Sequence, residues 1–408
     1  MERDELAAWL RLTLTPGVGN DTARRLLAAF GLPQAIFQQG GAALRQVVTS
    51  AQADALAREP EGLPALLQAT GDWLAAAEGG LARRIATLGD SAYPASLLAI
   101  EDPPLMLYLL GQVQLIDSES NRPQASTNIA LTAINHEANG WPARALALVG
   151  SRSPTPQGRQ NAQQFAQALG ATGLSIVSGL ALGVDGAAHE GALQAVDEAA
   201  PPRRLATIAV IGTGIDRVYP RQHRELAHRI ARHGLIVSEY PLGTPPLPAN
   251  FPKRNRLIAG LAQGTLVVEA APQSGSLITA RLAAEQGKEV FAIPGSIHNP
   301  QSRGCHQLIR QGAKLVETAQ DVLEELRWPA KGAPESIAES AYPTPAEPPD
   351  GPQTALLEAL GADPVGLDAL MARTGLDTAT LQARLLELEL DGHVGRLPGG
   401  LFQRLGRA

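Results

Sequence analysis

The sequence predicts an α/β fold built on a doubly wound, mostly parallel sheet. Six short apolar runs lie between residues 145 and 293, and most of them are separated by segments long enough to form a helix. The first run, Ala145–Val149, is apolar throughout, as is typical of a strand buried on both faces of a sheet. Each run passes into small polar or glycine residues, which mark the ends of strands. Strands that alternate with helices in this way favour a parallel sheet.

The expected strands follow one another at regular intervals. Ala145–Val149 is followed by the polar turn Gly150-Ser151-Arg152 and by a segment of helical composition, residues 158–169. The other expected strands are residues 174–177, 205–211, 235–237, 266–268 and 289–293. We expect an extended Rossmann-like arrangement, in which ligands bind at the carboxyl ends of the strands. The glycine-rich loops at those ends allow backbone N–H groups to approach an anion closely.

Residues 1–86 predict a small helical domain, because their apolar residues recur at helical spacing. Within it, Leu14–Gly19 followed by a helix at residues 23–30 resembles a helix-hairpin-helix, whose glycine turn offers N–H groups to a phosphate. The alternative is a tight turn between two helices without a ligand. The acidic composition of this domain favours the plain turn, although the DNA-binding interpretation stays open. A SAM-like or helix-hairpin-helix-like domain is therefore expected.

Residues 87–328 are expected to form the Rossmann-like domain. Leu105–Leu110 predicts a strand added at the edge of its sheet, and the polar, patternless residues 117–143 predict an inserted surface loop. A proline-rich stretch, residues 329–352, follows this domain and is poor in large apolar residues. Such a stretch has little with which to form a core, so we expect a linker.

Residues 353–408 predict a winged-helix-like domain. Three short helices are expected at residues 353–360, 367–373 and 379–390, with Asp377 placed to cap the third, and a hairpin is expected at residues 392–405. A helix that reads DNA is usually basic, but the third helix carries Arg384 among three acidic residues, Glu387, Glu389 and Asp391. This composition favours a protein contact or a purely structural role for the domain.

The distribution of charge points to an anionic partner, although the whole chain has a formal net charge of −6. Residues 144–260 hold 13 Lys and Arg against 7 Asp and Glu, a net charge of +6. Arg152, Arg254 and Arg256 lie in or beside the expected crevice loops. A solvated basic face remains the alternative to a binding site.

Cysteine content and hydropathy indicate a cytoplasmic protein. Cys305 is the single cysteine, so no intrachain disulfide and no cluster of thiolate metal ligands is expected. The amino terminus is acidic and lacks the apolar core of a secretion signal, and no apolar run of about 18 residues occurs. We therefore expect a chain that neither enters nor crosses a membrane.

Several kinds of enzyme chemistry are disfavoured by the motifs. The loops after the first and third strands lack the three-glycine dinucleotide fingerprint, and no Gly-x-x-x-x-Gly-Lys-Ser/Thr segment occurs. His223, His228 and His233 are spaced by five residues, so they do not share a helix face. No catalytic residue, no metal ligand and no cofactor is predicted.

The most informative stretch is residues 250–260, just before the fifth expected strand. Phe251, Lys253, Arg254 and Arg256 lie there together with Asn250 and Asn255. An aromatic face, several cations and amide groups are what single-stranded nucleic acid requires: base stacking, phosphate neutralisation and hydrogen bonding to base edges. The alternative is a basic helix start with Phe251 buried against the core.

The motifs in this order resemble those of the DNA-processing protein A family, DprA or Smf, over about residues 85–325. The motifs are Gly-Ser-Arg at 150–152, Ser-Gly-x-Ala-x-Gly-x-Asp at 178–185, Gly-x-Gly-x-Asp-x-x-Tyr-Pro at 212–220, Phe-Pro-x-Arg-Asn-Arg at 251–256, Ser-Gly-Ser at 274–276 and Pro-Gly-Ser at 294–296. Members of that family often carry a helical domain before the sheet and a winged helix after it. The inserted loop at 117–143 departs from the family pattern.

The resemblance implies a protein without catalytic activity. Its members bind incoming single-stranded DNA during natural transformation, protect it and help load the RecA recombinase, and they are typically dimers through the sheet domain. The apolar stretch Leu308–Val316 is a candidate for the dimer surface here. The residues that match the family's DNA-binding motifs are Gly150, Ser151, Arg152, Gly179, Phe251, Lys253, Arg254, Asn255, Arg256, Ser274, Gly275 and Ser276, with Arg221 as a further candidate.

Two alternatives from other functional classes remain. The fold also resembles nucleotide phosphoribohydrolases of the lysine-decarboxylase-like group, which use a Pro-Gly-Gly-x-Gly-Thr loop and a glutamate. The corresponding stretch here, Glu269–Ser276, holds one glycine and no such loop. A sensor of small nucleotides that does not bind DNA is the other alternative.

Overall fold

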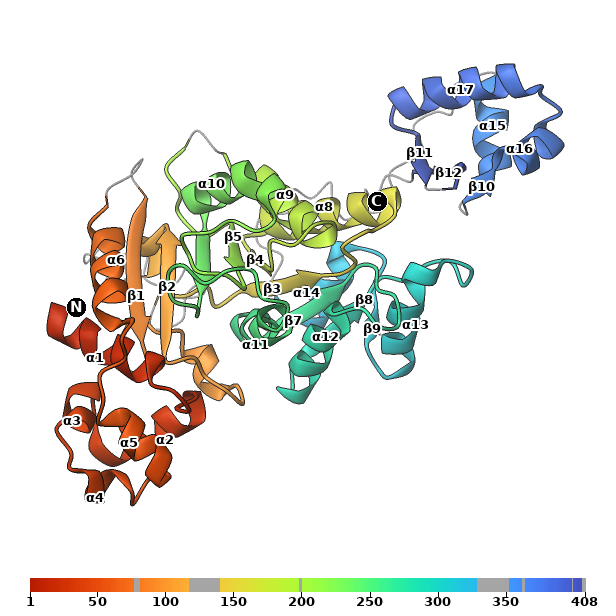
Figure 1. Ribbon diagram of the computed structural model, residues 1–408. Coiled ribbons are helices and arrows are strands. Elements are labelled where there is room, and N and C mark those ends of the chain that lie inside the picture. Colours follow the sequence, from red (N-terminus) through yellow and green to blue (C-terminus); the bar gives the residue numbers. More distant parts are fainter. Residues whose placement is uncertain are drawn as a thin grey trace. The chain divides into compact units, whose positions relative to one another are not determined.

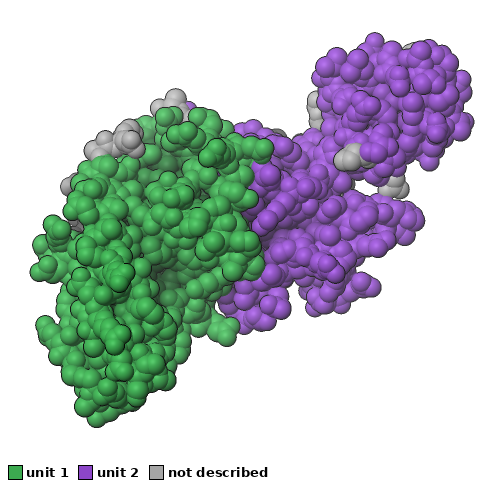
Figure 2. Space-filling view, in the orientation of Figure 1, with its two compact units in different colours: residues 1–145, 198–262 green, residues 146–197, 263–408 purple. Residues whose placement is uncertain are grey.

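The structure is a computed structural model that describes residues 1–76, 81–116, 140–197, 200–328, 352–361, 364–397 and 399–405. It contains two compact units. The first unit comprises residues 1–145 and 198–262, and the second comprises residues 146–197 and 263–408 (Figure 2). Most of the expected inserted loop, residues 117–139, and most of the expected linker, residues 329–351, lie outside the described residues.

Six helices form the amino-terminal part of the first unit (Figure 1). Helix α1 has two acidic residues in its first turn, where the helix dipole favours negative charge, and it buries Leu6, Trp9 and Leu10. Thr49 and Gln52 form a capping box that begins α5. The bounds are α1 Arg3–Leu14, α2 Asn20–Phe30, α3 Pro33–Phe37, α4 Gly41–Leu44, α5 Ser50–Leu56 and α6 Leu63–Ala75.

Four strands of the first unit lie in the order β1-β2-β6-β5. Strand β1 pairs antiparallel with β2, β2 pairs antiparallel with β6, and β5 and β6 are parallel. Their bounds are β1 Ala82–Thr87, β2 Met106–Gly111, β5 Thr207–Val210 and β6 Leu235–Ser238. The connecting helices are η1 Ala95–Ala99, η2 Val113–Ile116, η3 Arg221–His223, α10 Arg224–His233 and α11 Asn250–Leu261.

Strand β1 corrects the prediction of helical structure through residue 86. Arg83 and Arg84 interrupt the apolar run at the start of this strand, so no strand pattern is visible in the sequence. The structure accommodates both cations: the Arg83 guanidinium donates to the carbonyl of Trp73, and Arg84 pairs with Asp90 at 3.2 Å. Strand β1 also occupies the edge position that the sequence assigned to β2.

The strands of the second unit lie in the order β4-β3-β7-β8-β9, and the pairs β3/β7, β7/β8 and β8/β9 are parallel. Helices cover this sheet, and their apolar faces join the strands in a core that includes Leu148, Phe165 and Phe291. The mostly parallel sheet with flanking helices is confirmed. The bounds are β3 Ala145–Val149, α8 Pro156–Ala171, β4 Ser175–Ser178, α9 Val184–Gln194, β7 Gly264–Val267, α12 Ser276–Glu285, β8 Glu289–Ala292, η4 Pro300–Ser302, α13 Arg303–Arg310, β9 Lys314–Leu315 and α14 Ala319–Glu325.

The carboxyl-terminal elements have a core of their own, which includes Leu370, Leu385 and Phe402. Asp377 accepts hydrogen bonds from the backbone N–H groups of Ala379 and Thr380 and caps the third of these helices, as predicted. Three helices and a hairpin in this order confirm the winged-helix-like fold. The bounds are α15 Pro352–Leu360, β10 Val365–Gly366, α16 Leu367–Thr374, α17 Thr378–Leu390, β11 Val394–Leu397 and β12 Leu401–Arg404.

Among the described helices, none is long and apolar enough to cross a membrane. Within the same ranges, no group of three or more His, Cys, Asp or Glu is placed to hold a metal ion. Cys305 is buried, and its burial raises the pKa of the thiol to about 12. The thiol is therefore protonated at neutral pH and packs as a small apolar side chain.

Candidate functional site

Helix α11 carries the basic motif at residues 251–256, but its three cations have different environments. Lys253 is exposed and forms no salt bridge with any described residue. Arg254 is only 4% exposed, and its Nη1 donates to the carbonyl of Val210, the last residue of β5. Asn255 is buried beside it. Lys253 is therefore the cation of this motif that solvent reaches.

Arg256 is held in a buried network of acidic groups. Its guanidinium donates to both carboxylate oxygens of Glu239, which directly follows β6, and its Nη2 lies 3.3 Å from Oδ2 of Asp102. Burial of Arg256 acts to lower its pKa, but the hydrogen bonds and charge of Glu239 outweigh burial, so that the pKa of Arg256 is raised. The charge of Arg256 is compensated inside the protein, and this residue fixes the position of α11.

Phe251 and Tyr219 form a partly exposed aromatic pair in the first unit. Their ring centroids are 5.6 Å apart and their planes are inclined by 40°. Phe251 packs against Gly212, where an added Cβ would lie 3.1 Å from the phenyl ring, and Asn250 donates to the carbonyl of Gly212 at 3.1 Å. Tyr219 is 49% exposed. The aromatic pair thus presents a ring surface to solvent at the start of α11.

Arg221 lies two residues after Tyr219, in the short helix η3. Its side chain is exposed and forms no salt bridge with a described residue. Together with Lys253 it supplies positive charge on the two chain segments that carry the aromatic pair. The first unit thus contains Arg221, Phe251, Lys253, Arg254, Asn255 and Arg256 of the candidate residues.

The turn after β3, residues 150–152, is held from several sides within the second unit. Ser151 is buried; its N–H donates to the carbonyl of Glu269 at 2.7 Å and its carbonyl accepts from the N–H of Val184 at 3.1 Å. A Cβ added at Gly150 would lie 2.8 Å from Val184 and 2.9 Å from the carbonyl oxygen of Glu269, so only glycine fits without a shift. Arg152 is exposed at the end of this braced turn.

The side chain of Glu269 holds the start of α8. Its carboxylate accepts hydrogen bonds from the Thr155 N–H at 2.8 Å and the Thr155 hydroxyl at 2.6 Å, and Thr155 caps α8. Burial raises the pKa of Glu269, although the hydrogen bonds from Thr155 oppose that rise. Both carboxylate oxygens are thus occupied by donors of the protein itself.

The loop after β4, residues 179–183, packs against the turn at residues 150–152. The Ser178 hydroxyl donates to the carbonyl of Leu148 at 2.7 Å, and Gly179 is buried. Gly183 has a φ of +81°, and a Cβ there would meet the carbonyl oxygen of Ser151 at 2.4 Å. Asp185 accepts from the N–H of Ala181 at 3.3 Å, which agrees with its interpretation as a stabiliser of the helix start.

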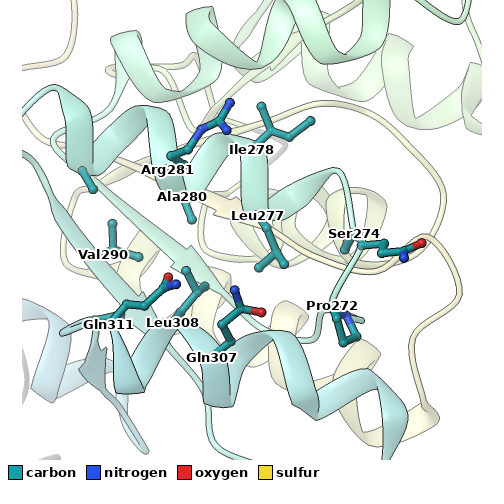
Figure 3. A pocket seen from close by; sticks show the side chains of 13 residues that line it. Pro272, Ser274, Leu277, Ile278, Ala280, Arg281, Val290, Gln307, Leu308 and Gln311 are labelled. Atoms are coloured by element: carbon teal, nitrogen blue, oxygen red, sulfur yellow. The ribbon is translucent and has the colours of Figure 1, made fainter.

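Ser274, Gly275 and Ser276 form the turn before α12. The two serine hydroxyl oxygens are 2.7 Å apart, Gly275 is exposed and Ser276 is buried. A groove of about 480 Å³ extends from Ser274 between α12 and α13 (Figure 3). Leu277 and Leu308 line it from the two helices, and polar side chains lie along it.

The candidate residues therefore fall into two groups. The first unit holds the aromatic pair and α11, while Gly150, Ser151, Arg152, Gly179 and Ser274–Ser276 belong to the second unit. Within the second unit, the turn at residues 150–152 contacts the segment at Glu269 and the loop before α9. Arg254 and Arg256 differ from the other candidate cations because the structure buries their charges.

Three contributing residues were not identified as site residues from the sequence. Tyr219 stands in a recognised motif but gave no signal of ring packing with Phe251. Glu239 directly follows β6 and Glu269 lies two residues after β7, and an acidic residue near the end of a buried strand was an available signal. Their partners, Arg256 and Thr155, are 17 and 114 residues distant in the chain, so the pairing could not be read from the sequence.

The glycine turn of the amino-terminal helices also has a defined environment. Gly17 has a φ of +75°, and its carbonyl accepts from the side chain of Gln52 at 2.8 Å. Arg24, one of the two cations near this turn, donates to Asp102 at 2.8 Å. Hydrogen bonds from Arg24 and Asn20, with the charge of Arg256, outweigh burial and lower the pKa of Asp102. These contacts involve a carbonyl of the turn and one nearby cation, and the plain turn stays a prediction.

Comparison with known proteins gives a consistent assignment. The sequence profile described as DNA recombination-mediator protein A matches residues 136–327, and the profile described as DprA winged helix domain matches residues 340–400. Protein Smf of Escherichia coli (strain K12) is 39% identical over 78% of this chain and 76% of its own length. The DNA processing protein DprA of Streptococcus pneumoniae is 42% identical over 59% of this chain and 73% of its own length.

A solved structure agrees with the sequence matches. The X-ray structure of DNA processing protein A from Streptococcus pneumoniae superimposes with a TM-score of 0.60 and a sequence identity of 33%. The superposition covers 80% of this chain and 98% of that chain. The likeness thus extends well beyond the sheet strands.

Proposed function

The chain belongs to the DNA recombination-mediator protein A family, and from this membership we propose that it binds single-stranded DNA and promotes recombination of the bound strand. The observation that carries the proposal is the partly exposed aromatic pair, Tyr219 and Phe251, with the exposed cations Arg221 and Lys253 on the same two segments. Aromatic rings provide stacking surfaces for unpaired bases and the cations neutralise the phosphates between them.

Single strands fit this arrangement better than a duplex. The bases of a single strand are available for stacking, whereas those of a duplex are already stacked on one another and paired. A base stacked on an aromatic side chain contributes about 1–3 kcal/mol whatever its sequence. The winged helix carries an acidic third helix, and this composition supports a role other than reading the grooves of DNA.

The residues of the second unit contribute backbone donors and one exposed cation. The turn at residues 150–152, which ends at Arg152, and the loop at residues 179–183 contact one another. A rigid glycine-rich loop at the carboxyl end of a strand suits close approach of a phosphate. Arg152, Gly179 and the Ser274–Ser276 turn are the residues of the second unit that we propose to contact DNA.

The protein acts on DNA by binding and not by catalysis. Glu269 begins the stretch that corresponds to the catalytic loop of the nucleotide phosphoribohydrolases. Its carboxylate accepts two hydrogen bonds from Thr155. Occupied acceptors do not favour a role as a general base. In this proposal the protein holds incoming strands during natural transformation and helps load the RecA recombinase in the cytoplasm.

Assembly into a homodimer would involve the surface at Leu308–Val316. Strand β9 is the last strand of its sheet, and Leu315 on it is 43% exposed. An edge strand offers unpaired backbone groups to a second chain, and an exposed leucine adds apolar area to such a contact. Sedimentation of the Leu315→Glu variant tests this surface, since a dimer formed here becomes a monomer.

Photocrosslinking tests the proposed DNA site directly. An oligonucleotide that contains 4-thiothymidine is irradiated with the intact protein, and the modified peptides are identified by mass spectrometry. We expect crosslinks at the peptides that contain Tyr219 and Phe251. Crosslinks confined to the winged helix or to the amino-terminal helices would contradict the assignment of the site.

A further inference from the structure

The first unit contains a second basic feature, a cavity of about 820 Å³. Of its lining residues, only Arg221 also belongs to the candidate DNA-binding residues. Some of its lining residues belong to β1, β2 and α10, which Figure 1 labels, and we refer to it as the basic cavity. Its lining includes three arginines, Arg83, Arg221 and Arg224, together with His228 and a single acid, Asp216.

The positive charge of the basic cavity is largely uncompensated. Arg221 and Arg224 are exposed, and neither forms a salt bridge with any residue in the described ranges. Asp216 is engaged elsewhere: one of its oxygens accepts from the Gly243 N–H at 2.9 Å and the other lies 3.7 Å from Arg217. A cavity lined by three arginines and one acid attracts an anion, because its walls concentrate the field of those cations.

The lining favours phosphate groups over bases. Trp73 is the only aromatic ring that lines the cavity, among the residues the structure describes, and it is 9% exposed. Its ring is in edge contact with Tyr108 and lies beneath the Arg83 guanidinium, 5.8 Å from the ring centre. A base has no open ring face on which to stack here, whereas a phosphate needs only the charged groups.

The basic cavity is joined to the candidate DNA site through Arg221. This residue lines the cavity and lies two positions after Tyr219, which packs on Phe251. We propose that the basic cavity binds backbone phosphates of the same single strand, on one side of the bases held at the aromatic pair. This proposal rests on the proposed function, and it assigns Arg224 and His228 as additional DNA-contacting residues.

The test compares oligonucleotides of two lengths, about 4 and about 16 nucleotides, which span the site sizes common for single-strand binding folds. Fluorescence anisotropy over a salt series gives the affinity and the salt slope of the intact protein and of the double variant Arg224→Gln, His228→Gln. Arg232→Gln is the matched control, because Arg232 is an exposed arginine of the same helix outside the cavity.

We expect the double variant to bind the long strand more weakly, with a salt slope reduced by about 0.7 for the lost arginine contact. Its affinity for the short strand should equal that of the wild type, and the control should match the wild type at both lengths. The inference is overturned if the double variant binds both lengths like the wild type, or if it weakens both lengths equally.

Two further results separate this inference from its alternatives. If the wild type binds neither length, the proposed function itself fails, whatever the variants do. Inorganic triphosphate distinguishes a strand site from a site for free polyphosphate. In one outcome, triphosphate stabilises the wild type against heat but does not stabilise the double variant, while both proteins bind the long strand equally well. This outcome would assign the cavity to a free anion and overturn the inference.

Discussion

Arg256 and Glu239 form a two-point ion pair, in which Nη1 lies 2.7 Å from Oε1 and Nη2 lies 2.5 Å from Oε2. Their side chains are 10% and 5% exposed, so the pair is shielded from water. It ties α11 to the loop that follows β6. A motif with three cations therefore presents mainly Lys253 to solvent, while Arg254 and Arg256 hold the helix that carries it.

Removal of Glu239 should destabilise the protein. The Glu239→Ala variant leaves Arg256 buried with Asp102 as its remaining acidic partner, at 3.3 Å. Breaking a buried ion pair lowers the free energy of unfolding by about 3–5 kcal/mol. Because Asp102 still pairs with Arg256, we expect a loss of about 3 kcal/mol. Urea denaturation measures the free energy of unfolding. Glu225→Ala, at an exposed glutamate of α10, is the control; an equal loss in both variants would contradict the account.

Lys253 and Arg254 should behave differently when each is replaced by alanine. Lys253→Ala should weaken single-strand binding and lower the salt slope by about 0.7, without a change in stability, because its charge is exposed. Arg254→Ala removes the donor to the Val210 carbonyl and should lower the free energy of unfolding by about 1–3 kcal/mol. Anisotropy and urea denaturation are measured on both. Equal effects of both changes on stability would argue against the assigned roles.

Tyr219→Ala should reduce affinity for single strands without a change in salt slope. Tyr219 is 49% exposed, so its removal spares the core while it deletes half of the aromatic pair. Loss of one base stack costs about 1–3 kcal/mol of binding free energy, and no phosphate contact is lost with it. A salt slope that falls together with the affinity would show that the ring acts through neighbouring cations and not by stacking.

The contribution of Asp102 should depend on pH. Its folded pKa is lowered from the ordinary value of 3.8, chiefly because Arg24, Asn20 and Arg256 outweigh the opposing effect of burial. A carboxyl group with a lowered folded pKa contributes stability that is fully present above its unfolded pKa and is lost as the pH falls through the folded pKa. The difference in unfolding free energy between wild type and Asp102→Asn should shrink below about pH 4. A difference that stays constant from pH 7 to pH 3 would refute this expectation.

The sequence predicted the sheet of the second unit well, because the strands there are buried on both faces and read as continuous apolar runs. Ala145–Val149 has the bounds that its composition indicated. Strand β1 was missed because Arg83 and Arg84 stand at its start, and their partners, Trp73 and Asp90, give no sign of a strand in the sequence. A strand with charged side chains gives no local signal when tertiary contacts stabilise it.

The candidate site was predicted in its residue types but not in their roles. Composition alone treats the cations of residues 251–256 as equivalent. In the structure, Arg256 is buried and paired with Glu239, and Arg254 is buried and donates to the carbonyl of Val210. Which cation stays exposed depends on the partners that the fold brings to each one. The ring contact of Tyr219 with Phe251 depends on the fold in the same way, because Tyr219 lies just before η3 and Phe251 lies in α11.

Anisotropy of a labelled oligonucleotide, single-stranded against duplex, over a salt series and with the full chain, tests the central claim most directly. The account predicts tighter binding of the single strand, with a salt slope that Lys253→Ala reduces by about 0.7 and that Arg232→Ala leaves unchanged. Equal affinity for the two forms of DNA, or no binding of either, would contradict the claim that this protein holds single strands at the aromatic pair.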